Sequence, residues 1–129
     1  MAKAIHQEVT ISGTPQQVYD AILNSKSFAA MTGGREAEIS TKEGGASTMF
    51  GGDIRARNVE LDPGKLIVQA WRSQAWPTGV YSICRFALSP AGGKTKLVFD
   101  QAGYPDEAHD MLETGWTQMY WEPLENTLG

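Results

Sequence analysis

The sequence predicts an α+β fold in which one curved antiparallel sheet is covered by a single long C-terminal helix. Between residues 35 and 101, apolar and polar side chains alternate, and turn signals such as Asp62-Pro63-Gly64 interrupt the alternation. Short connections between successive strands favour antiparallel hairpins. From Asp106 to about Leu128 the apolar spacing becomes helical. This helix is the only predicted element long enough to cover the apolar face of the sheet.

The sheet is expected to contain about six or seven strands, with two short helices after the first strand. Thr14 is a suitable cap for the first helix, with Pro15 at its first position. The second helix is expected from Ser25 to Met31, with Ser25 or Ser27 as its cap. Strands are expected near residues 4–11, 36–40, 46–50, 54–61, 65–72, 80–88 and 95–101.

The C-terminal helix carries an apolar stripe that is expected to face the sheet. Tyr120 and Leu124 lie beside this stripe, and Gly115 and Pro123 break the helix rules. Such violations often mark close packing or a functional need. The stripe consists of Leu112, Trp116, Met119 and Pro123, and the residues expected to face inward are Gly115, Trp116, Met119 and Pro123.

Length and charge restrict the class of protein. The 129 residues suit one domain, residues 1–129, and 41% hydrophobic with 20% charged residues is ordinary for a globular chain. The net charge of −4 argues against a general attraction to nucleic acid or anionic lipid. Six acids and no Lys or Arg fall in residues 105–129. This acidity is expected on the solvated back of the last helix.

The cellular compartment is expected to be the cytoplasm. Cys84 is the only cysteine, which excludes an intrachain disulfide and suits a reducing environment. Residues 1–7 lack the apolar region of a signal peptide, and no apolar run approaches the roughly 18 residues of a membrane span.

Several motifs, in order and spacing, resemble one known family over nearly the whole chain. The segment from Gly115 to Leu124, GWTQMYWEPL, resembles the C-terminal signature of domains related to the activator of the heat-shock-protein-90 ATPase. The run from Ile67 to Pro77, IVQAWRSQAWP, is similar to that family's Trp-Arg…Trp-Pro stretch. Gly13-Thr14-Pro15 with Val18-Tyr19 is similar to its N-terminal helix entry. Ser47 and Ala56 depart from the usual aromatic and glycine of the family.

The resemblance is to the C-terminal type of domain in this family. It implies a START-like (SRPBCC) helix-grip fold. Many members of that superfamily bind apolar ligands in a cavity between the sheet and the last helix. The eukaryotic activators also carry a separate N-terminal domain that makes the main chaperone contact. The resemblance therefore implies either ligand binding or a chaperone-associated, stress-related role.

A cavity is expected where small residues of the strand near 80–88 lie opposite Gly115. If Phe86 points inward, Ser82 and Cys84 do so too. The alternative is that the same aromatic and methionine side chains pack a solid core. The candidate cavity residues are Gln69, Trp71, Trp76, Ser82, Cys84, Phe86, Leu97, Phe99, Leu112, Gly115, Trp116 and Met119.

No catalytic, metal or cofactor site is expected. Cys84 has no basic partner placed near it by the sequence, because Arg85 points to the other face of the strand. His109 and Glu113 share a helix face, but two ligands do not make a metal site, and His6 is expected to be exposed. We find no phosphate loop or zinc spacing.

Two surfaces and three functions remain open at this stage. Trp121 and Leu124 lie on a helical stripe that is either a contact surface for a chaperone or a second copy, or further core. Trp76 is expected at the mouth of the cavity. Binding of an apolar small molecule ranks first, a chaperone-associated interaction module second, and an enzyme of the helix-grip superfamily third, because no general acid–base pair faces the cavity.

Overall fold

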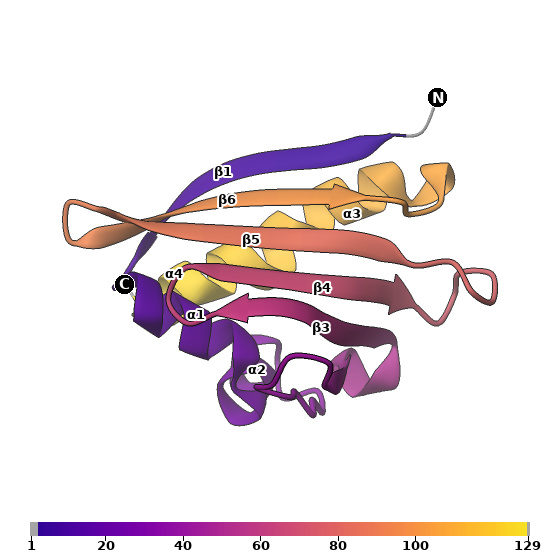
Figure 1. Cartoon of the computed structure of the whole chain (residues 1–129), viewed down its shortest axis with the longest axis horizontal. Coiled ribbons are helices and arrows are strands. Elements are labelled where there is room, and N and C mark those ends of the chain that lie inside the picture. Colours follow the sequence, from indigo (N-terminus) through magenta and orange to yellow (C-terminus); the bar gives the residue numbers. More distant parts are fainter. Residues whose placement is uncertain (1–2, 129) are drawn as a thin grey trace.

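The computed structural model describes residues 3–128 and consists of one antiparallel sheet with helices on one side. Within these residues the sheet has six strands in the order β1-β6-β5-β4-β3-β2. In Figure 1 the C-terminal helix crosses diagonally behind the strands. Residues 1, 2 and 129 of the expected domain lie outside the described residues. The strands are β1 (Ala4–Ser12), β2 (Ala46–Met49), β3 (Ile54–Asp62), β4 (Leu66–Ser73), β5 (Ser82–Ala91) and β6 (Lys94–Ala102).

The helices and helical turns fall into an early pair and a C-terminal series. They are α1 (Pro15–Leu23), α2 (Ser25–Met31), the 3₁₀ turns η1 (Phe50–Gly52) and η2 (Asp106–Ala108), α3 (His109–Trp116), the π-helical η3 (Thr117–Trp121) and α4 (Glu122–Leu128). The predicted α+β architecture, with two short helices after the first strand and a long helix at the end, is confirmed.

The predicted cap of α1, Thr14, is confirmed, whereas the predicted cap of α2 is wrong. The Thr14 side chain accepts a hydrogen bond from the backbone of Gln17, whose side chain accepts one in return, which forms a capping box. The cap of α2 is Asn24 rather than Ser25 or Ser27. Its side-chain oxygen accepts a hydrogen bond of 2.9 Å from the Ser27 backbone.

The expected strand near residues 36–40 is wrong. Only one isolated bridge, Glu38 to Thr48, forms there. The reason is that hydroxyl groups take the backbone donors a strand partner would need. The Ile39 N–H donates to Ser25 Oγ at 2.8 Å, and the Ser40 N–H donates to Ser47 Oγ at 3.0 Å. A separate difference is that β5 begins at Ser82, two residues later than the strand expected near residues 80–88.

The C-terminal helix contains a widened turn directly before Pro123. Glu122 donates its backbone N–H to the Thr117 carbonyl, five residues earlier, as in a π-helix. Pro123 has no N–H to donate to the Met119 carbonyl, and its ring crowds the preceding turn. The wider turn accommodates both effects. We therefore attribute the π-helical segment to Pro123.

The widened turn changes which side chains face the sheet. Trp116 is buried as expected, but Gly115, Met119 and Pro123 are only partly buried. Tyr120, Trp121 and Leu124 complete the buried face, at 3%, 4% and 0% exposure. Of the two alternatives for Trp121 and Leu124, further core is confirmed and a contact surface is wrong, because both residues are buried.

The back of the helix is acidic and exposed, as expected. The exposed acids are Asp106, Glu107, Asp110, Glu113 and Glu122, whereas Glu125 is half-buried.

Among the helices of residues 3–128, none combines the length and the apolar character that crossing a membrane requires.

Glu125 joins the last helix to the end of β1, and this contact predicts an acid-sensitive contribution to stability. Its carboxylate accepts hydrogen bonds of 2.7 Å from both the backbone N–H and the hydroxyl of Ser12. These bonds, the backbone bond first, lower the pKa of Glu125. The stabilisation is complete above the ordinary glutamate pKa of about 4.3 and is lost as the pH falls through the lower folded value.

We expect Glu125→Gln to destabilise the protein at pH 7 and to flatten the dependence of unfolding free energy on pH in the acid range. Urea denaturation at several pH values measures both effects. Glu122→Gln, on an exposed carboxylate of the same helix, is the control. An unchanged pH dependence in Glu125→Gln contradicts the assignment.

Candidate functional site

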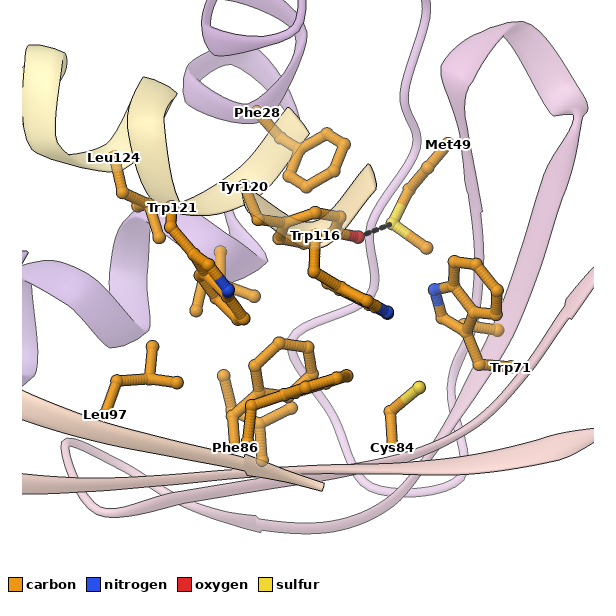
Figure 2. Close-up of a cluster of buried hydrophobic side chains, with 14 of the residues drawn as sticks. Phe28, Met49, Trp71, Cys84, Phe86, Leu97, Trp116, Tyr120, Trp121 and Leu124 are labelled. Atoms are coloured by element: carbon orange, nitrogen blue, oxygen red, sulfur yellow. Dashed lines mark hydrogen bonds between the residues drawn. The ribbon is translucent and has the colours of Figure 1, made fainter. Parts of the chain in front are cut away.

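Beneath the second half of the C-terminal helix the core is solid. Figure 2 shows Trp116, Tyr120 and Trp121 projecting from the helix toward Phe86 and Leu97 of the sheet. The Trp116 ring lies 4.2 Å from Phe99 and 4.4 Å from Tyr120, measured between ring centroids. Phe86, Leu97 and Phe99, which we expected to line a cavity, are fully buried in this packing.

A chain of buried hydrogen bonds fixes the orientation of Trp116. Its indole N–H donates to the Gln101 side-chain oxygen at 2.8 Å, and the Gln101 amide donates to Ser82 Oγ at 2.9 Å. Ser82 donates in turn to the carbonyl of Trp71 at 2.9 Å. Ser82, a candidate cavity residue, thus uses its hydroxyl group in hydrogen bonds within the core. Gln69, another candidate, donates to Asn58 Oδ1 at 3.1 Å.

Cys84 is an inert thiol, as expected. It is fully buried, and burial raises the pKa of its thiol far above the ordinary value. Its nearest polar contact is Ser82 Oγ, 4.0 Å from the sulfur. A neutral, buried thiol without a basic partner is not a nucleophile.

Both histidines bond to local partners. His6, with 57% of its side chain exposed, contacts Asp100 at 2.6 Å and Glu8 at 3.0 Å on the outer face of the sheet. These bonds, that of Asp100 first, raise the pKa of His6. His109 accepts a hydrogen bond of 2.6 Å from the Tyr104 hydroxyl and contacts Glu113 at 2.8 Å. Among residues 3–128 no three His, Cys, Asp or Glu side chains converge to hold a metal.

A cavity of about 210 Å³ lies between the first half of the C-terminal helix and the β3–β4 side of the sheet. Its walls are mostly apolar and aromatic, and its charged residues are exposed ones, Arg35 and Asp53. The lining consists of Arg35, Phe50, Asp53, Ile54, Trp71, Met111, Leu112, Gly115, Trp116, Met119 and Tyr120.

Five of the predicted residues meet at this cavity, and seven lie elsewhere. Trp71, Leu112, Gly115, Trp116 and Met119 line it. Of the others, Trp76 packs against Trp71 at 5.7 Å and supports the wall from outside. The remaining residues outside the lining are Gln69, Ser82, Cys84, Phe86, Leu97 and Phe99.

Gly115 opens the cavity from the helix side. No atom of another described segment lies within 4 Å of the position that a Cβ on Gly115 would occupy. Close packing therefore does not explain this glycine, although glycine within a helix costs about 1 kcal/mol relative to alanine. The space that it leaves belongs to the cavity.

The opposite wall contains a strained residue that the sequence reasoning missed. Phe50 has a left-handed φ of 55°, a conformation that costs a non-glycine residue about 1–2 kcal/mol. Arg35 holds it by donating to its carbonyl at 2.7 Å and by lying 5.5 Å from its ring centroid. The Gly51-Gly52 pair after Phe50 was the available signal, because glycines allow such a turn.

Trp71 contributes a buried indole N–H to this region. Burial raises the pKa of the nearby Tyr120 hydroxyl far above its ordinary value, and the Trp71 N–H partly opposes this rise. This N–H makes no regular hydrogen bond to any residue among those described.

A curved antiparallel sheet packed on a long C-terminal helix, with a small cavity between them, defines a helix-grip protein. The chain belongs to the family described as "Activator of Hsp90 ATPase homolog 1-like protein", whose family model matches residues 12–129. The family and fold expected from the sequence motifs are thus confirmed.

Curated relatives share this family, but the chain spans only about a third of their length. An "Activator of 90 kDa heat shock protein ATPase homolog" from Dictyostelium discoideum is 30% identical over 115 residues, covering 88% of this chain and 30% of the relative. "Activator of 90 kDa heat shock protein ATPase homolog 2" from Mus musculus is 27% identical over 125 residues, covering 97% of this chain and 38% of the relative.

Solved structures confirm the fold at low sequence identity. PFC0360w, described as an HSP90 activator from Plasmodium falciparum, superposes with a TM-score of 0.91 at 22% identity, covering 98% of this chain and 96% of that chain. The structure described as the Aha1 dimer from Colwellia psychrerythraea gives 0.80 at 15% identity, covering 98% and 99%.

The hydrogen bond between Trp116 and Gln101 predicts a measurable coupling energy. Gln101→Leu leaves the buried indole N–H without its acceptor, which costs about 1–3 kcal/mol. Once Trp116→Phe has removed that donor, the same leucine substitution is expected to cost less. Urea denaturation of the two single variants and the double variant gives the coupling, expected at about 1 kcal/mol. Strictly additive losses contradict the prediction.

Proposed function

We propose that this chain is a binding module that holds a small aromatic or other apolar molecule in the cavity beside Gly115. The observation that carries the proposal is the open space in front of this glycine, in a helix whose Trp116, Tyr120, Trp121 and Leu124 are buried in the core. A helix retains an unfavourable residue where packing or function requires it, and packing does not require it here.

The size and lining of the cavity indicate the chemical class of the ligand. An apolar cavity of about 150 Å³ accommodates benzene. A space of about 210 Å³ therefore suits a substituted benzene or a comparably small ring system. The rings of Phe50, Trp71, Trp116 and Tyr120 offer aromatic contacts, which favour an aromatic ligand. Arg35 and Asp53 leave the exposed part of the lining polar, so a ligand with one polar end fits best.

Gly115→Leu tests the proposal without damaging the fold. The new side chain enters open space, and leucine is a better helix former than glycine, so thermal stability is expected to stay equal or to rise. Ligand-observed NMR with toluene, indole and naphthalene is expected to detect binding to the parent protein. The variant should bind at least tenfold more weakly, a loss of about 1.4 kcal/mol.

Thr114→Leu, on the neighbouring exposed position, is the matched control and should bind as the parent does. If the parent binds none of the three probes, or if Gly115→Leu binds them equally well, the cavity is not a ligand site.

A second candidate function is a chaperone-associated interaction module in the cytoplasm, as the printed names of the curated relatives suggest. In this case the chain acts like the C-terminal domain of such an activator. Its contact surface must then differ from Trp121 and Leu124, which are buried. We expect the purified chain to raise the ATPase rate of the 90 kDa heat shock protein from the same organism, measured in a coupled assay. An unchanged rate together with no detectable binding eliminates this candidate.

A further inference from the structure

The outer face of the sheet, turned away from the helices, has an unusual composition in the half formed by β2, β3, β4 and the start of β5. Outward positions of an exposed antiparallel sheet are usually polar. Here Tyr81, just before β5, is 51% exposed and Ile83 is 49% exposed. Ala70 lies between Ile83 and Arg57 in the strand register. Exposed apolar side chains gathered in this way mark interaction surfaces.

Arginine side chains surround these apolar residues, and the acid of this half, Glu38, lies opposite Thr48 beyond β2. Arg55 and Arg57 are exposed on β3, and Arg72 lies directly opposite Arg55 on β4. Like charges placed opposite each other destabilise a sheet. Within residues 3–128 no arginine forms an ion pair shorter than 4.0 Å. The arginines of this half therefore have no ion-pair partner among residues 3–128.

A shallow groove of about 400 Å³ lies between these side chains. Arg72 stabilises the side of the groove that Tyr81 forms. It donates to the carbonyls of Trp76 at 2.8 Å and Pro77 at 3.2 Å, and its guanidinium carbon lies 5.6 Å from the Tyr81 ring centroid. The groove is thus a preformed surface. Its lining consists of Ala46, Ser47, Thr48, Arg55, Ala56, Arg57, Ala70 and Tyr81.

We propose that this groove, together with Ile83, docks an acidic segment of another protein that carries apolar side chains among its acids. Arginine and tyrosine are the residue types that most often dominate binding energy at protein interfaces. The guanidinium groups, which form no ion pair within residues 3–128, match carboxylates, and the exposed rings and methyl groups match apolar side chains between them. The proposal does not depend on the cavity or on its ligand.

The charge distribution disfavours two other occupants. An extended nucleic acid would run from the arginines toward Glu60 and Asp62, which lie on the same outer face at the other end of β3. A second copy carries its exposed acids on the back of the C-terminal helix, on the opposite side of the molecule. Pairing that helix with this groove is heterologous, and such contacts produce open chains or rings rather than a closed dimer.

Fluorescence anisotropy with a fluorescein-labelled synthetic peptide rich in aspartate, glutamate, leucine and phenylalanine tests the proposal. We expect the parent protein to bind this peptide and to ignore a peptide in which asparagine and glutamine replace the acids. Arg55→Glu with Arg57→Glu is expected to weaken binding at least tenfold, and Tyr81→Ser to weaken it by a smaller factor. Added salt should weaken binding to the parent.

Lys26→Glu with Lys94→Glu is the control, because it changes the net charge equally at exposed sites outside the groove. Circular dichroism melts establish that each variant is folded, and Arg55→Glu alone is measured because Arg57 also donates to the Gly44 carbonyl at 2.6 Å. The proposal is overturned if the parent protein binds both peptides equally or binds neither peptide. It is also overturned if the lysine control weakens binding as much as the arginine variant does, or if a DNA duplex displaces the peptide. Sedimentation velocity that shows a dimer dissociated by the arginine variant also overturns it.

Discussion

The wide π-helical turn before Pro123 is the constraint on which the arrangement of the core depends. In a regular α-helix, Trp116, Tyr120 and Leu124 would share one face and Trp121 would lie off it. The extra residue in the turn rotates the chain so that Tyr120 and Trp121 both enter the core. Trp121 then reaches β1, where its indole N–H donates to Gln7 Oε1 at 2.7 Å. The helix is thereby fixed to the edge strand β1 as well as to β6, which Trp116 contacts through Gln101.

The turn also divides the space beneath the helix into two parts. After residue 116 the phase shift places one more large ring against the sheet, and the core there is filled. Before it, the helix presents Leu112 and Gly115 toward η1 and β3, and these residues, together with Met119 on the next turn, do not fill the gap. Trp116 forms the boundary, held by Gln101 on the sheet. A filled core and a cavity therefore coexist under one helix, and the alternatives of solid core and open cavity each hold for one half.

Local signals in the sequence were sufficient for most of the fold. The cap at Thr14, the alternation in the strands and the helical stripe after residue 106 all depend on near neighbours, which is why they could be read directly. The phase shift at Pro123 could not, because an inward face was assigned on regular helical spacing. The far wall of the cavity was also missed. Phe50 and Arg35 come from segments whose position depends on long-range contacts that no periodicity records.

The two faces of the sheet differ in how their polar groups are used. On the inner face Gln101 donates to Ser82, Ser82 donates to the Trp71 carbonyl, and Gln69 donates to Asn58, so these polar side chains serve to position the core. On the outer face the charges at the β1–β6 edge are paired among His6, Asp100, Glu8 and Lys96. The arginines at the β3 side have no such partners. Because the same sheet neutralises its charges at one edge and leaves them unpaired at the other, the asymmetry distinguishes the β3 side from ordinary solvated surface. The sheet of this chain thus has an apolar cavity on its inner face and arginines without ion-pair partners on its outer face.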